Sequence, residues 1–413
     1  MHKRLSSLLL VSLLLSACTL FSPRPVENQS LVSPAPPSET PIPSPTDTLV
    51  PPTTTVTQTP RPTFTPTPEY PPQGYGPKNF PPDINPLTGL SVADTDTLDR
   101  RPVAIKVNIV PRTSTRPPWG LSKANIVYDY YQNDGYTRFH AIFLGDEATQ
   151  VGPIRSARFP DDSLIRMYKS IFAYGSADRT INSRLLNSEY FNRLVLEGGG
   201  TALCPPTEDE PLCRYDPNGY DFLLGGTEEI RAAAVSNGTI DTRQNLDGMH
   251  FQLDPPQGGI TGNQATIRYS GDDYTRWEYD PDTGLYMRFQ DNVLDTGQGE
   301  EYAPLTDREY NDEQISAANV VVMLTPHSYF RQPPSEIVEI LLFGTGKAYA
   351  FRDGQAYEVN WSIPTQDSVL TLTLPDGSPF PFKPGNTWIQ VVGQSSVVTQ
   401  PEVADWRFEF KFP

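Results

Sequence analysis

SKANIVYDYYQNDGYTRFHAIFLG, residues 122–145, is the stretch that decides the fold. Its first run of apolar and aromatic residues ends at Asp134-Gly135, a dipeptide that favours a tight turn. The run after this turn is rich in aromatic and β-branched residues and reads as a strand. Upstream, RPVAIKVNIV at 101–110 alternates like a strand as well. The pattern predicts a sheet in this part of the chain.

Helical patterns follow this predicted sheet. A helix is expected from Asp161 to Ser170, and residues 182–199 carry apolar side chains at helical spacing before a run of glycines. A third helix is expected in 225–238, with Thr227 as its N-cap and Gly238 after its end. Residues 79–250 are therefore predicted to form a mixed α/β domain.

The sequence pattern changes after about residue 260. Short runs of β-forming residues are separated by Asp-Gly, Thr-Gly and Pro-Gly turns up to the C-terminus, which is typical of antiparallel strands. Residues 251–413 are predicted to form a β-rich C-terminal domain, with the boundary in 245–262. The fold class expected for the whole chain is α+β, a mixed α/β domain followed by a mostly antiparallel β domain.

The N-terminus indicates export and lipid anchoring. Residues 1–17 combine a basic start with a short apolar run, as in a signal peptide, and Leu15-Ser16-Ala17-Cys18 matches a lipobox. A plain secretory signal with a coincidental cysteine is the alternative. Residues 18–78 are a Pro/Thr-rich segment that lacks apolar periodicity, so a disordered linker is expected. We therefore predict a lipoprotein anchored through Cys18 on the extracytoplasmic face of a bacterial membrane.

Charge and cysteine content limit the classes of partner and cofactor that the chain could bind. The chain has 32 basic and 49 acidic residues, a net charge of −17, and loss of residues 1–17 would leave 30 against 49, or −19. So acidic a chain does not suit nucleic acid, whose binding depends on neutralising phosphates. Export favours a disulfide between Cys204 and Cys213. No metal or other cofactor is expected, because the remaining histidines are scattered.

Motifs in both segments resemble the YerB-like family of bacterial lipoproteins, a domain family of unknown function. The matching pieces in the first segment are Asn85-Pro86-Leu87-Thr88-Gly89-Leu90, Arg101-Pro102-Val103-Ala104, Gly120-Leu121-Ser122-Lys123-Ala124, Ile126-Val127-Tyr128, Thr137-Arg138-Phe139 and Gly152-Pro153-Ile154-Arg155-Ser156-Ala157-Arg158. Those in the second include Asn319-Val320-Val321-Val322, Gly344-Thr345-Gly346, Trp361 and Pro384-Gly385-Asn386-Thr387-Trp388.

The resemblance spans nearly all of residues 83–393. It implies a lipid anchor, a linker, a mixed domain and a β-rich domain, and it implies no established reaction. The chain departs from the family pattern at Asn133, where an acidic residue is usual. A Pro-His-Asn segment is usual near residues 214–220, and its histidine is missing here.

The loop VGPIRSARFP, 151–160, carries the candidate binding residues. Its Gly-Pro turn delivers Arg155 and Arg158 just before a helix, with Ser156 between them. Guanidinium groups beside free helix N–H groups suit a carboxylate or phosphate, and Arg138 is expected to join them. The alternative is that the arginines pair with the protein's own acids, such as Asp129 or Asp178. Ser156 has no visible base, so it is a weak candidate for a nucleophile.

Asp129 is the candidate catalytic residue. Together with Asp134 beside the Gly135 turn it offers a carboxylate pair of the kind that cleaves glycans, although acids near turns are usually solvated. The tyrosines at 128, 130, 131 and 136 suit either stacking on sugar rings or packing in the core.

Three functions follow from these features. The leading hypothesis is a membrane-anchored lipoprotein that binds an anionic or glycan-containing cell-envelope partner through the arginine loop. The first alternative is a cell-wall glycan hydrolase or lyase that uses carboxylates near Asp129. The second is a protein–protein scaffold that uses exposed edges of the β-rich segment.

Overall fold

The turn predicted at Asp134-Gly135 joins two strands in the middle of a mixed sheet in the computed structural model, which describes residues 70–197, 202–219 and 221–412. The strands β2 (Ile126–Asn133) and β3 (Tyr136–Phe143) pair antiparallel across the turn. Asp134 and Gly135 both have positive φ, 56° and 85°, as a tight hairpin requires. The predicted signal peptide, Cys18 and most of the predicted linker lie outside the described residues.

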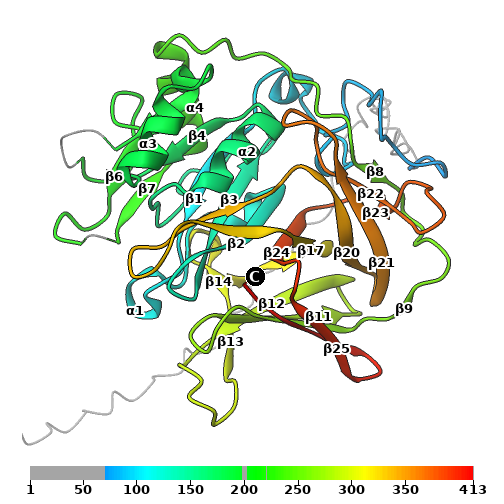
Figure 1. The fold of residues 1–413 in the computed structure, drawn as a ribbon. Coiled ribbons are helices and arrows are strands. Elements are labelled where there is room, and N and C mark those ends of the chain that lie inside the picture. Colours follow the sequence, from blue (N-terminus) through cyan, green and yellow to red (C-terminus); the bar gives the residue numbers. More distant parts are fainter. Residues whose placement is uncertain (1–69, 198–201, 220, 413) are drawn as a thin grey trace, which may run out of the picture. The chain divides into compact units, whose positions relative to one another are not determined.

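The central sheet is built from both segments of the sequence (Figure 1). Its order is β22 (Thr371–Thr373), β21 (Gln355–Ile363), β20 (Gly344–Arg352), β17 (Asn319–Thr325), β24 (Thr387–Gly393), β2, β3, β1 (Val103–Val107), β4 (Ile171–Tyr174) and β5 (Leu194–Leu196), with β9 (Ile260–Thr261) beside β21. The segments meet where β2 runs parallel to β24, with Tyr128 opposite Ile389. The two predicted domains therefore share one sheet.

A second sheet belongs to the C-terminal segment alone. Its order is β13 (Tyr302–Pro304), β12 (Leu285–Asp291), β11 (Tyr274–Asp280), β10 (Gln264–Arg268), β26 (Asp405–Glu409) and β25 (Val397–Glu402), with β16 (Ser316–Ala317) beside β12. A separate hairpin joins β18 (His327–Arg331) to β19 (Ile337–Ile340), and β19 contacts β2.

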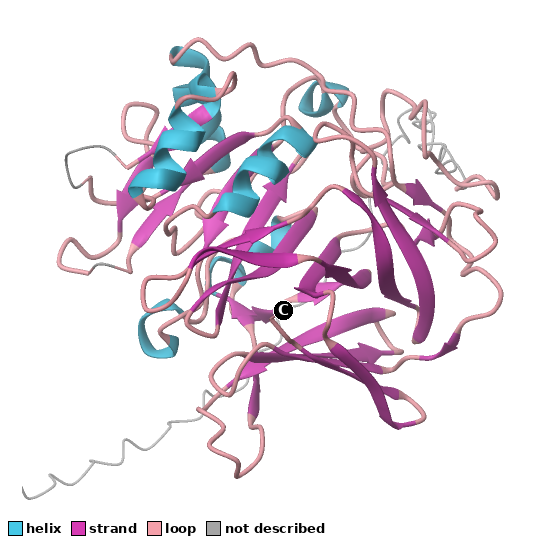
Figure 2. Ribbon diagram, viewed as in Figure 1, coloured by secondary structure: helices cyan, strands magenta, loops and turns pink. Residues whose placement is uncertain are grey.

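Helices are few and gather at one end of the central sheet (Figure 2). They are α1 (Arg112–Thr115), α2 (Phe159–Tyr168), α3 (Arg179–Leu186) and α4 (Thr227–Ser236), and α4 contacts β1, β4 and β5. The chain is of the α+β class, but strands outnumber helices more strongly than the sequence pattern predicts. No helix in the described part of the chain is long and apolar enough to cross a membrane.

Two of the helix predictions need correction. Residues 182–199 do not form one helix, because α3 ends at Leu186 and residues Leu194–Leu196 form strand β5, which pairs with β4. The apolar side chains of Leu194 and Val195 are buried at the edge of the sheet. Thr227 is not the N-cap of α4, since Gly226 holds that position. The Thr227 hydroxyl instead accepts a hydrogen bond from the Ala148 amide at 2.9 Å.

Residues 70–78, which the sequence analysis assigned to the linker, belong to the folded unit. Tyr75 and Phe251 exchange backbone hydrogen bonds of 2.9 and 2.8 Å, and the Gly248 amide donates to the Pro77 carbonyl. The Tyr70 and Tyr75 rings pack edge to face with centroids 4.9 Å apart. Backbone hydrogen bonds of Tyr75 and Pro77 therefore hold the end of the proline-rich segment against residues 248–251.

The predicted disulfide between Cys204 and Cys213 is present, with Cα atoms 4.9 Å apart. Replacing both cysteines by serine is expected to lower the free energy of unfolding by about 2–3 kcal/mol, because the disulfide reduces the conformational entropy of the unfolded chain. Urea denaturation with and without a reducing agent measures the effect. The double variant should be insensitive to the reductant, and a wild-type protein equally insensitive would contradict the assignment.

Candidate functional site

The arginine loop lies between β3 and α2 and is held by backbone hydrogen bonds on both sides. The Arg155 amide donates to the Lys106 carbonyl of β1 at 2.9 Å, and the Ala157 amide donates to the Ser176 carbonyl at 2.8 Å. Arg158 is the N-cap of α2, and its amide donates to the Asp161 carboxylate at 2.6 Å in a capping box. The loop is therefore a fixed platform.

Arg155 is paired within the protein. Its guanidinium forms an ion pair with Asp221, and both side chains are mostly buried, with 14% and 16% exposed. Neither of the partners that the sequence suggested is used here: Asp129 pairs with Arg288, and Asp178 pairs with Arg331 at 2.8 Å. Internal pairing, the alternative left open by the sequence, thus describes Arg155.

Arg138 and Arg158 have a different environment, because among the described residues neither guanidinium forms an ion pair. Arg138 donates to the Ser156 carbonyl at 2.9 Å and to the Asn108 amide oxygen at 3.3 Å. Arg158 donates to the Ala157 carbonyl at 2.9 Å and to the Asn133 amide oxygen at 3.2 Å. These direct acceptors are neutral, and the nearest carboxylates, Asp161 and Asp178, act on the charge of Arg158 only through space.

Burial dominates the electrostatics of the two arginines. Burial, together with Arg158 and Arg155, lowers the pKa of Arg138 well below its usual value. Burial also lowers the pKa of Arg158. In both cases the charged form is destabilised by the folded environment, so an anion that reached them would gain a stronger interaction than at an exposed arginine.

A fully buried polar cluster lies beneath the loop. The Asp161 carboxylate accepts a hydrogen bond from the Tyr130 hydroxyl at 2.5 Å, lies 2.8 Å from Nδ1 of His140 and lies 3.4 Å from Nζ of Lys106. These partners come from β2, β3 and β1. Asp161 therefore ties the first turn of α2 to the three neighbouring strands.

Burial has a strong effect on the charges of this cluster. It lowers the pKa of Lys106 to about 7 against the opposing influence of Asp161, and it lowers the pKa of His140. For Asp161, burial opposes ionisation, but Lys106, His140 and Tyr130 outweigh it and hold the pKa below its usual range. Asp161 is thus an ionised anchor under the arginine loop.

A polar pocket of about 330 Å³ opens beside the loop. We call it the arginine pocket; it is lined by Asn133, Ser156, Arg158, Ser176, Ala177, Asp178, Ile181, Arg331, Pro334, Ser335, Glu336 and Ile337. Of the predicted binding residues, Ser156 and Arg158 line it, while Arg138 reaches it indirectly by bonding the Ser156 carbonyl. The Ser156 and Ser176 hydroxyl oxygens lie 2.9 Å apart. Hydroxyl, amide and charged groups thus share one small cavity.

Asp129 is buried, so a polymeric substrate cannot reach its carboxylate. It is 1% exposed, and its carboxylate is 2.9 Å from Nη2 of Arg288, which is itself fully buried. Arg288 lies between aromatic rings, with its guanidinium carbon 4.5 Å from the Trp388 ring centroid and 4.9 Å from that of Phe139. The geometry disfavours Asp129 as a catalytic acid or base and gives it a structural role.

The tyrosines near the hairpin turn also mainly build the core. Tyr128 and Tyr130 are fully buried and Tyr131 is 8% exposed. Tyr131 stacks on Phe410 with ring centroids 4.9 Å apart. Stacking of sugar rings on Tyr128 or Tyr130 is therefore excluded in this structure.

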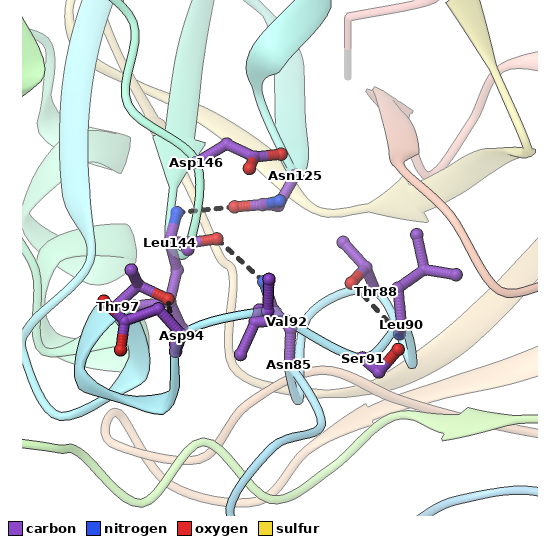
Figure 3. Close-up of a pocket in the computed structure, with 12 residues that line it drawn as sticks. Asn85, Thr88, Leu90, Ser91, Val92, Asp94, Thr97, Asn125, Leu144 and Asp146 are labelled. Carbon is purple, nitrogen blue, oxygen red and sulfur yellow. Dashed lines mark hydrogen bonds between the residues drawn. The ribbon is translucent and has the colours of Figure 1, made fainter. Parts of the chain in front are cut away.

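A second cavity, of about 300 Å³, is lined by part of the Asn85–Leu90 motif (Figure 3). The Asn85 side chain donates to the Leu144 carbonyl at 2.7 Å, and the Asn125 amide oxygen accepts from the Leu144 amide at 2.5 Å. Its charged lining residues, Asp94 and Asp146, are acidic. The motif residues thus support the backbone, and the cavity does not suit an anion.

Sequence reasoning missed several residues of the site. Lys106 carries a charge within the apolar run of 103–107, which is a signal that could have marked it as buried and paired. Asp161 has the pattern of an ordinary first-turn helix acid, so nothing local marked it. Glu336 and Arg331 come from the β18–β19 hairpin, far along the chain, and no local signal connects them to the loop. Among the described residues, no group of His, Cys, Asp or Glu side chains could hold a metal ion.

The fold and the pocket define a two-segment α+β protein with a polar pocket beside its central sheet. The model of the protein of unknown function (DUF3048) N-terminal domain matches residues 87–203, and that of the DUF3048 C-terminal domain matches residues 265–389. The chain belongs to the YerB-like family, whose function is unknown.

Two comparisons with individual proteins agree with this family. The chain is 28% identical to the putative lipoprotein YerB of Bacillus subtilis (strain 168) over 312 residues, which are 74% of this chain and 85% of the relative. A crystal structure of the YerB protein from Bacillus subtilis is similar, with a TM-score of 0.60 and 25% identity. The match covers 75% of this chain and 96% of that one.

Proposed function

We propose that this protein is a membrane-anchored extracytoplasmic lipoprotein that binds an anionic or glycan-containing partner of the cell envelope in the arginine pocket. The similarity to a putative lipoprotein supports the extracytoplasmic location, as does the lipobox at Cys18. The Cys204–Cys213 disulfide fits an oxidising compartment. The anchor through Cys18 and the envelope partner are parts of this proposal.

One observation carries the binding function. Arg158 lines the pocket, and Arg138 lies behind it against the Ser156 carbonyl. In the described part of the chain no carboxylate forms an ion pair with either guanidinium, although the protein has a large excess of acids. A buried charge without a partner is costly, and a bound anion would remove that cost. The Ser156 and Ser176 hydroxyls and the Asn133 amide add hydrogen-bonding groups of the kind that recognise sugars.

The arginine pocket is tested by replacing Arg158. The full chain, purified in detergent, is sedimented with insoluble purified cell wall. R158Q is expected to weaken binding about tenfold, since a charge-assisted hydrogen bond contributes about 1.5–3 kcal/mol. R158K keeps the charge and should retain part of the affinity.

Arg243 provides the matched control, because it is a partly exposed arginine outside the pocket that pairs with Asp99. R243Q should bind as the wild type does. Circular dichroism checks that R158Q is folded. A folded R158Q that sediments with the wall as well as R243Q would overturn the proposed site.

A further inference from the structure

The arginine pocket is lined by charged residues from several segments. The arginine loop gives Arg158, the segment before α3 gives Asp178, and the β18–β19 hairpin gives Arg331 and Glu336. Arg331 and Asp178 neutralise each other through their ion pair of 2.8 Å. The charges that remain in the lining are therefore one cation, Arg158, and one anion, Glu336.

Glu336 is held in a fixed position, and no cation of residues 70–197, 202–219 or 221–412 forms an ion pair with it. Its Oε1 accepts hydrogen bonds from the Tyr131 hydroxyl, at 2.8 Å, and from the Asp134 amide. Tyr131 is fixed in turn by its stacking on Phe410. Among the described residues, no hydrogen bond or ion pair engages Oε2 of Glu336. This oxygen is thus a preorganised acceptor without a cation, at the same pocket as a guanidinium without an anion.

From this pairing we infer that the pocket selects a zwitterionic group, with a carboxylate facing Arg158 and an ammonium facing Glu336, as in a free amino-acid or short peptide moiety. The inference rests on the proposed function and names the chemical class of its ligand. A cavity of about 330 Å³ is at the small end of ligand pockets, which matches an amino-acid-sized group. Glu336 would repel a second negative charge, so it acts against polyanions without amino groups.

Three forms of one probe test the selection: alanyl-alanine with free ends, its N-acetylated form and its C-amidated form. Each is titrated into the full chain in detergent and followed by ligand-observed NMR. The free dipeptide should bind at least about fivefold more tightly than either blocked form, since each blocked form loses one charged contact.

Charge variants assign each contact. In E336Q the amide oxygen can still accept from Tyr131 and Asp134, so the pocket should keep its shape, but N-acetylation should no longer weaken binding. In R158Q, C-amidation should no longer matter. E358Q, which alters an exposed glutamate on β21, should behave as the wild type.

The outcomes separate this inference from the proposed function. If the acetylated dipeptide binds as tightly as the free one and both require Arg158, the anion site stands and the zwitterion inference is wrong. If no dipeptide binds while cell-wall sedimentation still depends on Arg158, the inference alone is again overturned. If neither dipeptide binding nor sedimentation depends on Arg158, both fail.

Discussion

Replacing Asp129 by asparagine is expected to lower the free energy of unfolding by about 3–5 kcal/mol. The substitution keeps the shape of the side chain but removes the negative charge that faces Arg288 at 2.9 Å. Arg288 is fully buried among Trp277, Trp388 and Phe139, so water cannot replace the lost partner. The loss arises from an uncompensated buried cation rather than from a missing contact.

Urea denaturation of D129N, R288M and the double variant measures this pair. R288M should also be destabilised, because it leaves the Asp129 carboxylate buried without its cation. The double variant should recover part of the loss, since methionine suits the aromatic surroundings and no charge remains. E358Q, on the exposed face of β21, should change stability by less than about 0.5 kcal/mol.

The same experiment distinguishes a structural Asp129 from a catalytic one. A catalytic carboxylate is replaced with little loss of stability, because active sites often tolerate loss of a charged group. If D129N unfolds at the same urea concentration as the wild type, the structural role assigned here is wrong and the hydrolase alternative regains its candidate.

Local signals were enough to predict the Asp134-Gly135 turn, the strand after it and the helix at α2. Asp134-Gly135 between two β-forming runs fixes a tight turn, and the helix at α2 follows from its apolar spacing and first-turn acids. The prediction failed at 182–199, because the apolar residues at 194–196 suit a short buried strand as well as a helix. Periodicity alone does not separate the two over so few residues.

The joining of the two segments had no local signal. Strand β2 pairs with β24, more than two hundred residues later in the chain, and parallel pairing of this kind leaves no turn in the sequence. The buried Asp129–Arg288 pair, which also links the two segments, was hidden for the same reason. The change in sequence pattern near residue 250 is therefore not a boundary of the central sheet, which contains strands from both sides of it.

The candidate site was predicted in part. The spacing of Arg155, Ser156 and Arg158 after a Gly-Pro turn indicated a displayed loop, and the structure brings Arg138 to the same loop. The sequence could not tell which arginine is paired, because Asp221 lies far along the chain and contacts Arg155 only in the fold. Glu336 was missed because an acid in an acidic protein carries no signal until its neighbours are known.

A second buried carboxylate in the region that links the segments should make stability depend on pH. Asp273 accepts a hydrogen bond from the Thr137 amide at 2.6 Å. Burial, together with Asp291 and Asp129, raises its pKa to about 8 from the ordinary value of 3.8. The folded protein therefore keeps a proton on this carboxyl over a range in which the unfolded chain has released it.

The sign of the effect follows from this difference. Below about pH 4 both states hold the proton, and the folded state has its full stability from this group. Between about pH 4 and pH 8 the free energy of unfolding falls as pH rises, at up to about 1.4 kcal/mol per pH unit. Above about pH 8 both states are ionised and the slope from Asp273 ends.

D273N isolates this contribution, because asparagine is always neutral and keeps an oxygen that accepts from the Thr137 amide. Urea denaturation of the wild type and D273N at a series of pH values from 4 to 9 gives the difference in their free energies of unfolding. That difference should shift steadily in favour of D273N up to about pH 8 and then level off. For D282N, which alters an exposed turn aspartate, the corresponding difference should stay flat. A flat difference for D273N as well would mean that the Asp273 carboxyl is ionised in the folded protein, and that Arg116 and its neighbours offset the charges of Asp129 and Asp291.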